Sequence, residues 1–311
     1  MIVTVTLTPA LDKTVILPGF RVNEVNRIQS IRLDPGGKGI NVSKGLRALD
    51  VDSLATGILG GDTGRYIERS LHEIGIACDF VWTDRETRTN LKVIDPVLHT
   101  NTDINEPGAP VSADVLETVY RKAEAAVQPG DIVVFAGKAP PEAPDTVFAD
   151  WTVRLRERGV RVYLDADGEL LIQGAKACPT FIKPNDAELS RLVGRPFNDV
   201  KEMATAARML TETGIETVAV SLGGDGALFV TRDIILRGYG LKVEVQSTVG
   251  AGDSMLAAFA CAETRHMRFR DGCALAMAFS AAAVTTPGTQ PAEPEVVEAL
   301  LKQVVIEEMS I

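Results

Sequence analysis

The sequence has few cysteines, few histidines and no long apolar run, and these shortages exclude several classes of protein. Its 4 cysteines form no CxxC pair, and its 3 histidines show no spacing typical of metal ligands. Scattered cysteines favour reduced thiols over a disulfide framework or a zinc site. No stretch approaches the ~20 apolar residues that cross a bilayer, and residues 1–7 alternate like a strand and not like a secretory leader. We therefore expect a cytoplasmic protein.

Basic charge is also in short supply. The chain has 32 lysines and arginines against 42 acidic residues, which gives a net charge of -10. An acidic surface repels phosphate backbones and anionic membranes, so neither nucleic acid nor a membrane is an expected partner. A small anionic ligand needs only a local basic pocket and remains compatible with this charge. With 311 residues, of which 45% are hydrophobic, the chain can build one large core or two domains.

Short apolar runs alternate with helical patterns along most of the chain. The runs expected as strands are residues 2–7, 132–135, 160–164, 180–182, 217–221 and 227–230. The segments expected as helices are residues 64–74, 113–127, 145–158, 200–213, 253–264, 270–285 and 293–307. This alternation predicts an α/β fold in which helices cover both faces of a mainly parallel sheet.

Two stretches do not follow the α/β alternation. Residues 12–34 and 87–105 both alternate polar and apolar side chains, as extended chain does. Each stretch is too short to build a core of its own. We expect them to form together a small separate sheet that covers a site or pairs with a second subunit.

The stretch "DPGGKGINVSKGLRAL", residues 34–49, places a glycine-rich turn before an apolar helical pattern. Glycines allow close approach of a ligand to the backbone, and Lys38 adds a point charge. The spacing of a Walker A loop is absent. A bare glycine turn could equally be a structural helix start, but Lys38 together with Asn41 favours a polar, phosphorylated ligand.

Two further stretches directly follow expected strands, where ligands of open α/β sheets bind. In "KPNDAEL", residues 183–189, Asn185 and Glu188 are three apart and could organise Mg²⁺ with substrate phosphates. They could equally be a helix cap with its first-turn acid. In "SLGGDGAL", residues 221–228, the glycines could form a plain hairpin or expose amides to a nucleotide phosphate.

The stretch "STVGAGDSMLAAFA", residues 247–260, places Asp253 at the start of an apolar helix, after Gly250, Ala251 and Gly252. Amides at a helix N-terminus lack intrahelical partners and attract anions. The carboxylate is either a cap for those amides or a general base beside a bound phosphoryl group. The third glycine of GxGxxG is missing, which disfavours a dinucleotide-binding dehydrogenase.

In this order the four stretches resemble the ribokinase-like (PfkB) carbohydrate kinases, and the resemblance covers essentially the whole chain. "TPALDKT", "TRTNLKV" and "INEPG" resemble the branch of that family that acts on phosphosugars. The resemblance implies ATP- and Mg²⁺-dependent phosphorylation of a ketohexose phosphate, with D-fructose 1-phosphate as the expected substrate and fructose 1,6-bisphosphate as the product. Tagatose 6-phosphate and fructose 6-phosphate are the alternative substrates, and a sugar-phosphate sensor without catalysis is the alternative outside enzymes.

The resemblance also implies a fold. It predicts a three-layer α/β/α catalytic domain with a mainly parallel central sheet, made of residues 1–11, 35–86 and 106–311. Residues 12–34 and 87–105 would form a discontinuous β lid through which two copies of the chain make a homodimer.

Site roles follow from the resemblance position by position. Asp253 would be the catalytic base, and the amides of Gly250, Ala251 and Gly252 would form an anion hole. The residues expected to bind the sugar phosphate are Asp12, Gly37 and Asn41 for its hydroxyls and Arg27, Lys38 and Arg88 for its phosphate. The residues expected at ATP are Lys183, Asn185, Ser221, Gly223 and Gly226, with Glu188 and Asn185 organising Mg²⁺, Asn185 through water.

Three positions depart from the family pattern. Thr8 stands where the family usually has asparagine, and Thr89 where a β-branched apolar residue is common. "AGKAPP", residues 136–141, replaces a segment that usually resembles SGSLP. Lys138 in that segment is unexpected, and it bears on which sugar the site accepts.

Overall fold

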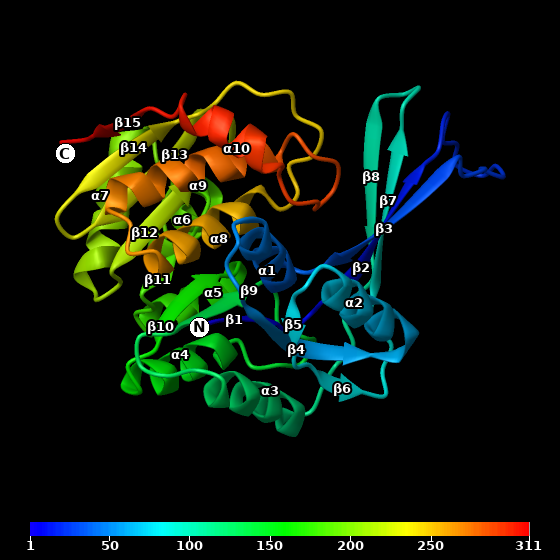
Figure 1. The fold of residues 1–311 in the computed structure, drawn as a ribbon, viewed down its shortest axis with the longest axis horizontal. Coiled ribbons are helices and arrows are strands. Elements are labelled where there is room, and N and C mark those ends of the chain that lie inside the picture. Colours follow the sequence, from blue (N-terminus) through cyan, green and yellow to red (C-terminus); the bar gives the residue numbers. More distant parts are fainter. Residues whose placement is uncertain (311) are drawn as a thin grey trace.

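A large mixed sheet runs through the centre of the computed structural model, which describes residues 1–310 (Figure 1). Within these residues the sheet has 11 strands in the order β15-β14-β13-β12-β11-β10-β9-β1-β4-β5, with β6 paired to β4. Its strands are β1 (Ile2–Thr6), β4 (Leu54–Gly60), β5 (Ala77–Cys78), β6 (Val81–Thr83), β9 (Ile132–Ala136), β10 (Arg161–Asp165), β11 (Phe181–Ile182), β12 (Thr217–Ser221), β13 (Gly226–Thr231), β14 (Ile235–Tyr239) and β15 (Ile306–Glu308).

The strands from β12 to β5 are parallel, and β13, β14 and β15 extend the sheet in antiparallel fashion. The central strands β1 and β9 are buried at every residue and consist mainly of apolar and β-branched side chains. Strands covered on both faces read as continuous apolar runs because neither face meets water. The predicted α/β fold with a mainly parallel sheet is therefore confirmed.

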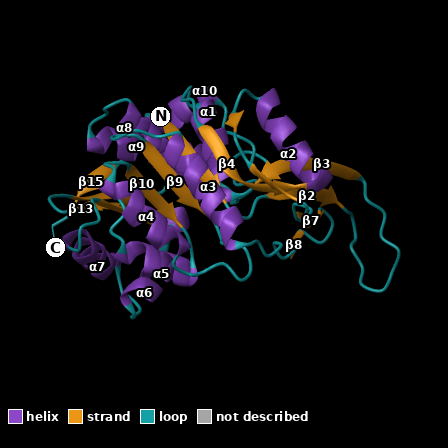
Figure 2. Cartoon of the chain, turned by 90° about the horizontal axis from the view of Figure 1, so that it is seen from below, coloured by secondary structure: helices purple, strands orange, loops and turns teal. Residues whose placement is uncertain are grey.

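Helices cover both faces of this sheet (Figure 2). The helices are α1 (Lys38–Ala48), α2 (Gly61–Glu73), α3 (Ala113–Ala125), α4 (Val147–Glu157), α5 (Gly168–Lys176), α6 (Asp186–Val193), α7 (Val200–Glu212), α8 (Ala251–Thr264), α9 (Phe269–Ala283) and α10 (Pro294–Leu301). One large core lies between the sheet and α3 to α7, and a second lies between the sheet and α1, α8, α9 and α10. None of the helices in residues 1–310 is long and apolar enough to cross a membrane.

Helices α1 and α8 pack closely because small residues face each other between them. A Cβ atom added to Gly45 would lie 2.9 Å from Cβ of Ala257. Asn41 and Asp253 stand one helical turn before these two residues, on the same faces of their helices. The close packing therefore places the start of α1 beside the start of α8.

The two stretches outside the α/β alternation form a separate four-stranded sheet, called the lid below. Its strands, in the order β3-β2-β7-β8, are β2 (Ala10–Ile16), β3 (Ser30–Gly36), β7 (Thr89–Asp95) and β8 (Thr100–Asn105). Val15, Leu17 and Val93 make a small core of its own. Figures 1 and 2 show the lid at one end of the molecule, with the loop between β2 and β3 extending away from it.

The structure differs from the expected elements at several places, of which two are informative. The helix expected over residues 293–307 ends at Leu301 in α10, and Ile306–Glu308 instead pairs with β14 as β15. The run Val304, Val305 and Ile306 is β-branched and favours a strand where a free sheet edge is available. Strand β4 was not expected, because glycines at 57 and 60 interrupt its apolar pattern.

Candidate active site

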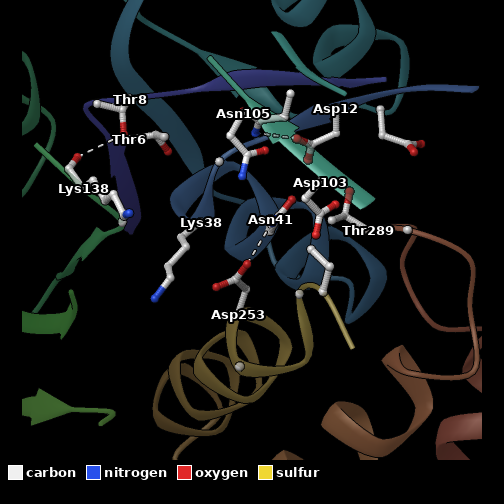
Figure 3. A pocket seen from close by; sticks show the side chains of 18 of the residues that line it. Thr6, Thr8, Asp12, Lys38, Asn41, Asp103, Asn105, Lys138, Asp253 and Thr289 are labelled. Carbon is white, nitrogen blue, oxygen red and sulfur yellow. Dashed lines mark hydrogen bonds between the residues drawn. The ribbon is translucent and has the colours of Figure 1, made fainter. Parts of the chain in front are cut away.

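A cavity of about 510 Å³ lies between the lid and the edge of the central sheet where the parallel strands end. Side chains from the lid, from α1 and from the start of α8 line it together (Figure 3). This position agrees with the rule that open α/β sheets bind ligands beyond the carboxyl ends of their strands.

Asp253 lies at the base of this cavity, in the first turn of α8. Its side chain is 6% exposed, and its carboxylate accepts a 2.8 Å hydrogen bond from Nδ2 of Asn41. The N-cap of α8 is Gly250, at φ 84°, and no side chain caps the helix. Asp253 therefore does not act as a cap for its own helix, and the first amides of α8 remain available to an anion.

The surroundings of Asp253 bring its pKa closer to neutral pH. Burial raises the pKa of Asp253 to about 6, and the nearby charge of Asp165 raises it as well. Lys38, the hydrogen bond from Asn41 and Lys183 act in the opposite direction. A carboxylate with this pKa is ionised at neutral pH and can still take a proton, as general bases require.

Asp165, at the end of β10, holds two lysines in the cavity, although the sequence analysis assigned it no role. Its carboxylate is 1% exposed and lies 3.0 Å from Nζ of Lys38 and 3.3 Å from Nζ of Lys183. Although burial alone would raise it, Lys183 and Lys38 lower the pKa of Asp165. Burial likewise disfavours the ammonium form of Lys38, yet the charges of Asp165 and Asp253 raise its pKa above the ordinary value. Asp165 and Lys38 are therefore both charged at neutral pH.

Glycine at position 252 leaves room for the end of the Lys183 side chain. A Cβ atom there would lie 2.8 Å from Nζ of Lys183, closer than real Cβ contacts allow. The backbone of the first turn of α8 thus lies close to Lys183, which directly follows β11.

Asn185 and Glu188 form a complete capping box at the start of α6. The Asn185 side chain accepts from the amide of Glu188, and the Glu188 carboxylate accepts from the amide of Asn185, both at 2.8 Å. The cap interpretation left open by the sequence is therefore realised. The box uses Oε2 of Glu188 and leaves Oε1 outside it. No cluster of three or more His, Cys, Asp or Glu side chains that could hold a metal occurs in residues 1–310.

The lid side of the cavity carries polar atoms without partners. Asp12 accepts a 2.9 Å hydrogen bond from Asn90, and burial raises the pKa of Asp12. Oδ1 of Asn41, Oδ1 of Asn90 and Oγ1 of Thr6 are buried and have no hydrogen-bond partner within the described chain. Buried polar atoms are normally paired, so these three acceptors indicate a ligand that carries hydroxyl groups.

A buried lysine, Lys44, stabilises the chain segments next to this side of the cavity. Nζ of Lys44 donates to Oγ1 of Thr289 at 2.9 Å and to the carbonyl of Pro35 at 3.2 Å. Burial lowers the pKa of Lys44 to about 8. Lys44 thereby fastens the chain around Thr289, which lines the cavity, to helix α1.

The structure places some of the remaining expected residues in the cavity and others outside it. Arg88 lines the cavity and donates from Nη1 to the carbonyl of Glu106 at 3.0 Å. Gly37 and Ser221 line it as well. Arg27 does not, because it is exposed in the loop between β2 and β3, which extends away from the cavity.

Gly223 and Gly226 also lie outside the lining of the cavity. They flank the short turn that joins β12 to β13, and these strands pair in antiparallel fashion as a hairpin. A Cβ atom on Gly226 would lie 2.1 Å from the carbonyl oxygen of Gly238, so packing against β14 accounts for this glycine.

Several cavity residues besides Asp165 had no place in the expected site, among them Asn90, Asp103 and Asn105. Asp165 directly follows an expected strand, a position that could have marked it. Asn90 lies within "TRTNLKV" and could have been selected with Arg88. Asp103 and Asn105 come from β8, which is polar and exposed at nearly every position and gives no distinguishing signal.

The comparisons with known proteins agree with this geometry. Residues 6–296 match the pfkB family carbohydrate kinase. The chain belongs to this family. Its sequence is 34% identical over 306 residues to the 1-phosphofructokinase of Haemophilus influenzae, covering 98% of this chain and 97% of that protein. It is 34% identical over 302 residues to the 1-phosphofructokinase of Bacillus subtilis, covering 95% and 98%.

This pfkB carbohydrate kinase also shares its architecture with a solved relative. The phosphofructokinase-2 of Escherichia coli, in complex with substrates and products, superposes with a TM-score of 0.93 at 28% identity, covering 97% of this chain and 98% of that one. The family resemblance and the expected fold are thereby confirmed.

Proposed function

We propose that this pfkB kinase transfers the γ-phosphoryl group of ATP to the 6-hydroxyl of D-fructose 1-phosphate and forms fructose 1,6-bisphosphate. The observation that carries the proposal is Asp253, a buried carboxylate with a pKa of about 6 beside uncapped helix amides in a cavity lined by cations. The 1-phosphofructokinases aligned over nearly the whole chain support the choice of sugar.

In this mechanism Asp253 accepts the proton of the 6-hydroxyl as that oxygen attacks the γ-phosphorus. Asn41 fixes the orientation of the carboxylate through its 2.8 Å hydrogen bond. The amides of Gly250, Ala251 and Gly252 receive negative charge on the transferring phosphoryl group, aided by the positive end of the α8 dipole. Positioning and charge stabilisation supply most of the rate in phosphoryl transfer.

Lys38 and Lys183 belong in this scheme beside the phosphates of ATP. Asp165 holds both ammonium groups in place, and the charge of Asp253 also acts on Lys38. Lys38 is therefore better placed to neutralise the transferring group than to bind the phosphate that the sugar already carries.

A divalent cation, Mg²⁺ in this proposal, fits the oxygen donors present. Magnesium is commonly bound by one or two carboxylates together with substrate phosphates and waters, so a dense protein cluster is not required. The buried Glu188 has Oε1 outside its capping box and acts electrostatically on Lys38. When bound, the cation neutralises charge on the nucleotide phosphates; Glu188 would hold it, with Asn185 contacting it through water.

On the lid side, the proposal assigns the sugar hydroxyls to Asp12, Asn41 and the acceptor oxygen of Asn90. Arg88, whose charge acts on Asp12, would bind the phosphate that the sugar already carries. Because ATP and sugar phosphates are retained in the cytoplasm, the proposal also places the protein there.

One solved relative favours a second substrate. Escherichia coli phosphofructokinase-2 has been solved in complex with fructose-6-phosphate, and that structure superposes with a TM-score of 0.89. ATP turnover measured in parallel with fructose 1-phosphate, fructose 6-phosphate and tagatose 6-phosphate tests the proposal. We expect the highest kcat/KM with fructose 1-phosphate; a higher value with either 6-phosphate would overturn the assignment.

We also propose that two copies of the chain associate through the lid. Ile31 on the edge strand β3 and Ile104 on the edge strand β8 are 54% and 53% exposed. Exposed apolar edge strands favour pairing with another chain. The E. coli relative has a tetrameric inhibited form. Light scattering after size exclusion should give a dimer for the wild type and a monomer for Ile31→Asp; a wild-type monomer would refute the association.

A further inference from the structure

The two departures Thr8 and Lys138 contact each other at the rim of the cavity. The Thr8 hydroxyl donates a 3.2 Å hydrogen bond to the carbonyl of Lys138, across 130 positions of sequence. Figure 3 shows the two residues together, with the Lys138 ammonium turned toward the cavity that it lines. Two positions that each depart from the family pattern therefore form one local structure.

The charge of Lys138 is only weakly engaged by the protein. Within the described chain its ion-pair partner is Asp167, at 4.0 Å, and the two side chains are 70% and 44% exposed. Such exposed pairs contribute little. Lys38, by contrast, lies 3.0 Å from a fully buried carboxylate. The Lys138 ammonium is thus available to an anion in the cavity.

Thr8 also contacts a second cation. Nη2 of Arg88 donates to the carbonyl of Thr8 at 3.4 Å, and Nε of Arg88 is buried without a partner. Lys38 and Lys183, by contrast, both lower the pKa of Asp253 and share the carboxylate of Asp165. Apart from Lys92, which pairs with Asp103, the cations that line the cavity fall into two pairs: Lys38 and Lys183 around Asp165, and Arg88 and Lys138 flanking Thr8.

A kinase acting on a phosphosugar must hold two phosphates at once, the transferring group and the group that the sugar already carries. We infer that Lys138, together with Arg88, binds the sugar's existing phosphate, and that Thr8 is the positioning residue for Lys138. Phosphate is recognised by charge-assisted hydrogen bonds from such paired cations. This inference rests on the proposed function and adds a contact specific to this chain.

The test compares Lys138→Met, which keeps length and removes charge, with the wild type. Calorimetric binding of fructose 1-phosphate without ATP should weaken about tenfold, the effect of losing one partly exposed charge-assisted hydrogen bond. The KM for fructose 1-phosphate should rise about tenfold, with kcat and the KM for ATP within about twofold. Lys138→Arg should restore most of the affinity. Lys201→Met, an exposed lysine on α7, is the matched control.

Fructose, which lacks the phosphate, separates this role from others. The ratio of kcat/KM for fructose 1-phosphate to that for fructose should fall about tenfold in Lys138→Met. An unchanged ratio with a raised KM for ATP would assign Lys138 to the nucleotide, and no change in any parameter would make it a solvated surface charge; either result overturns the inference. If the wild type prefers another phosphosugar, the proposed function fails, and the same ratio measured with that sugar still tests Lys138.

The positioning role of Thr8 has its own readout. Thr8→Val removes the hydroxyl donor and should weaken fructose 1-phosphate binding in the wild-type background. In the Lys138→Met background the same substitution should have almost no further effect, because coupled residues are not additive. Equal losses in both backgrounds would show that Thr8 acts independently of Lys138.

Discussion

The hydrogen bond between Asn41 and Asp253 gives a prediction about pH dependence. Nδ2 of Asn41 donates to the carboxylate at 2.8 Å, and this bond lowers a pKa that burial has raised to about 6. Asn41→Ala removes the donor from the ionised form of Asp253. The ionised carboxylate is then less stable, so its pKa must rise further.

The size of the change follows from the energy of the bond. A hydrogen bond to a charged group contributes about 1.5–3 kcal/mol, and about 1.4 kcal/mol corresponds to one pH unit. Water entering the vacated space offsets part of this loss, so we expect a pKa of about 7 in Asn41→Ala. The ionised fraction would fall about fivefold near pH 6, about twofold near pH 7 and hardly at all near pH 8.5.

Coupled ADP release, measured from about pH 5 to 9, provides the assay. The acid limb of kcat/KM should move upward by about one pH unit in Asn41→Ala. Asn41 also faces the sugar, but a lost sugar contact lowers kcat/KM equally at every pH. Asn90→Ala, which removes a sugar-side amide that does not contact Asp253, is the matched control and should keep the wild-type limb. Superimposed acid limbs for Asn41→Ala and the wild type would refute the reasoning.

Three other substitutions test the rest of the site. Asp253→Asn should lower kcat at least ~10²-fold with little change in fructose 1-phosphate binding, and near-normal turnover would remove Asp253 from the mechanism. Arg88→Ala should raise the KM for fructose 1-phosphate and leave the KM for ATP unchanged; an unaltered sugar KM would exclude Arg88 as a phosphate ligand. Gly45→Val overpacks the contact between α1 and α8, because a Cβ atom at position 45 would lie only 2.9 Å from Cβ of Ala257. It should cost about 1–3 kcal/mol in urea unfolding and lower kcat by separating Asn41 from Asp253; full stability and activity together would contradict the packing argument.

Much of the fold could be predicted because the relevant signals are local. Strand β9 is an uninterrupted apolar run, and β12 was located to the residue at both ends. The lid was also visible, since residues 12–34 and 87–105 alternate in the manner of extended chain. Where a local pattern is ambiguous, as at residues 304–306, the partner strand β14 decided the outcome.

The site was harder to predict from the sequence because its contacts join distant parts of the chain. Asp165 appears in the sequence as one acid after a strand, and only folding places it between lysines at positions 38 and 183. Arg27 carries the charge expected of a phosphate ligand, yet the loop that contains it leads away from the cavity.

The sequence by itself determined the alternation of strands and helices, the separate lid and the position of Asp253 at a helix start, because each depends on neighbouring residues. It could not decide whether Asp253 caps its own helix, and its role as a base stays a prediction. Only the tertiary structure showed that no side chain caps this helix and that the Asp253 carboxylate instead accepts a hydrogen bond from Asn41, 212 positions away. Burial, together with the charges of Asp165, Lys38 and Lys183, then set its pKa, and those charges meet only when the chain has folded.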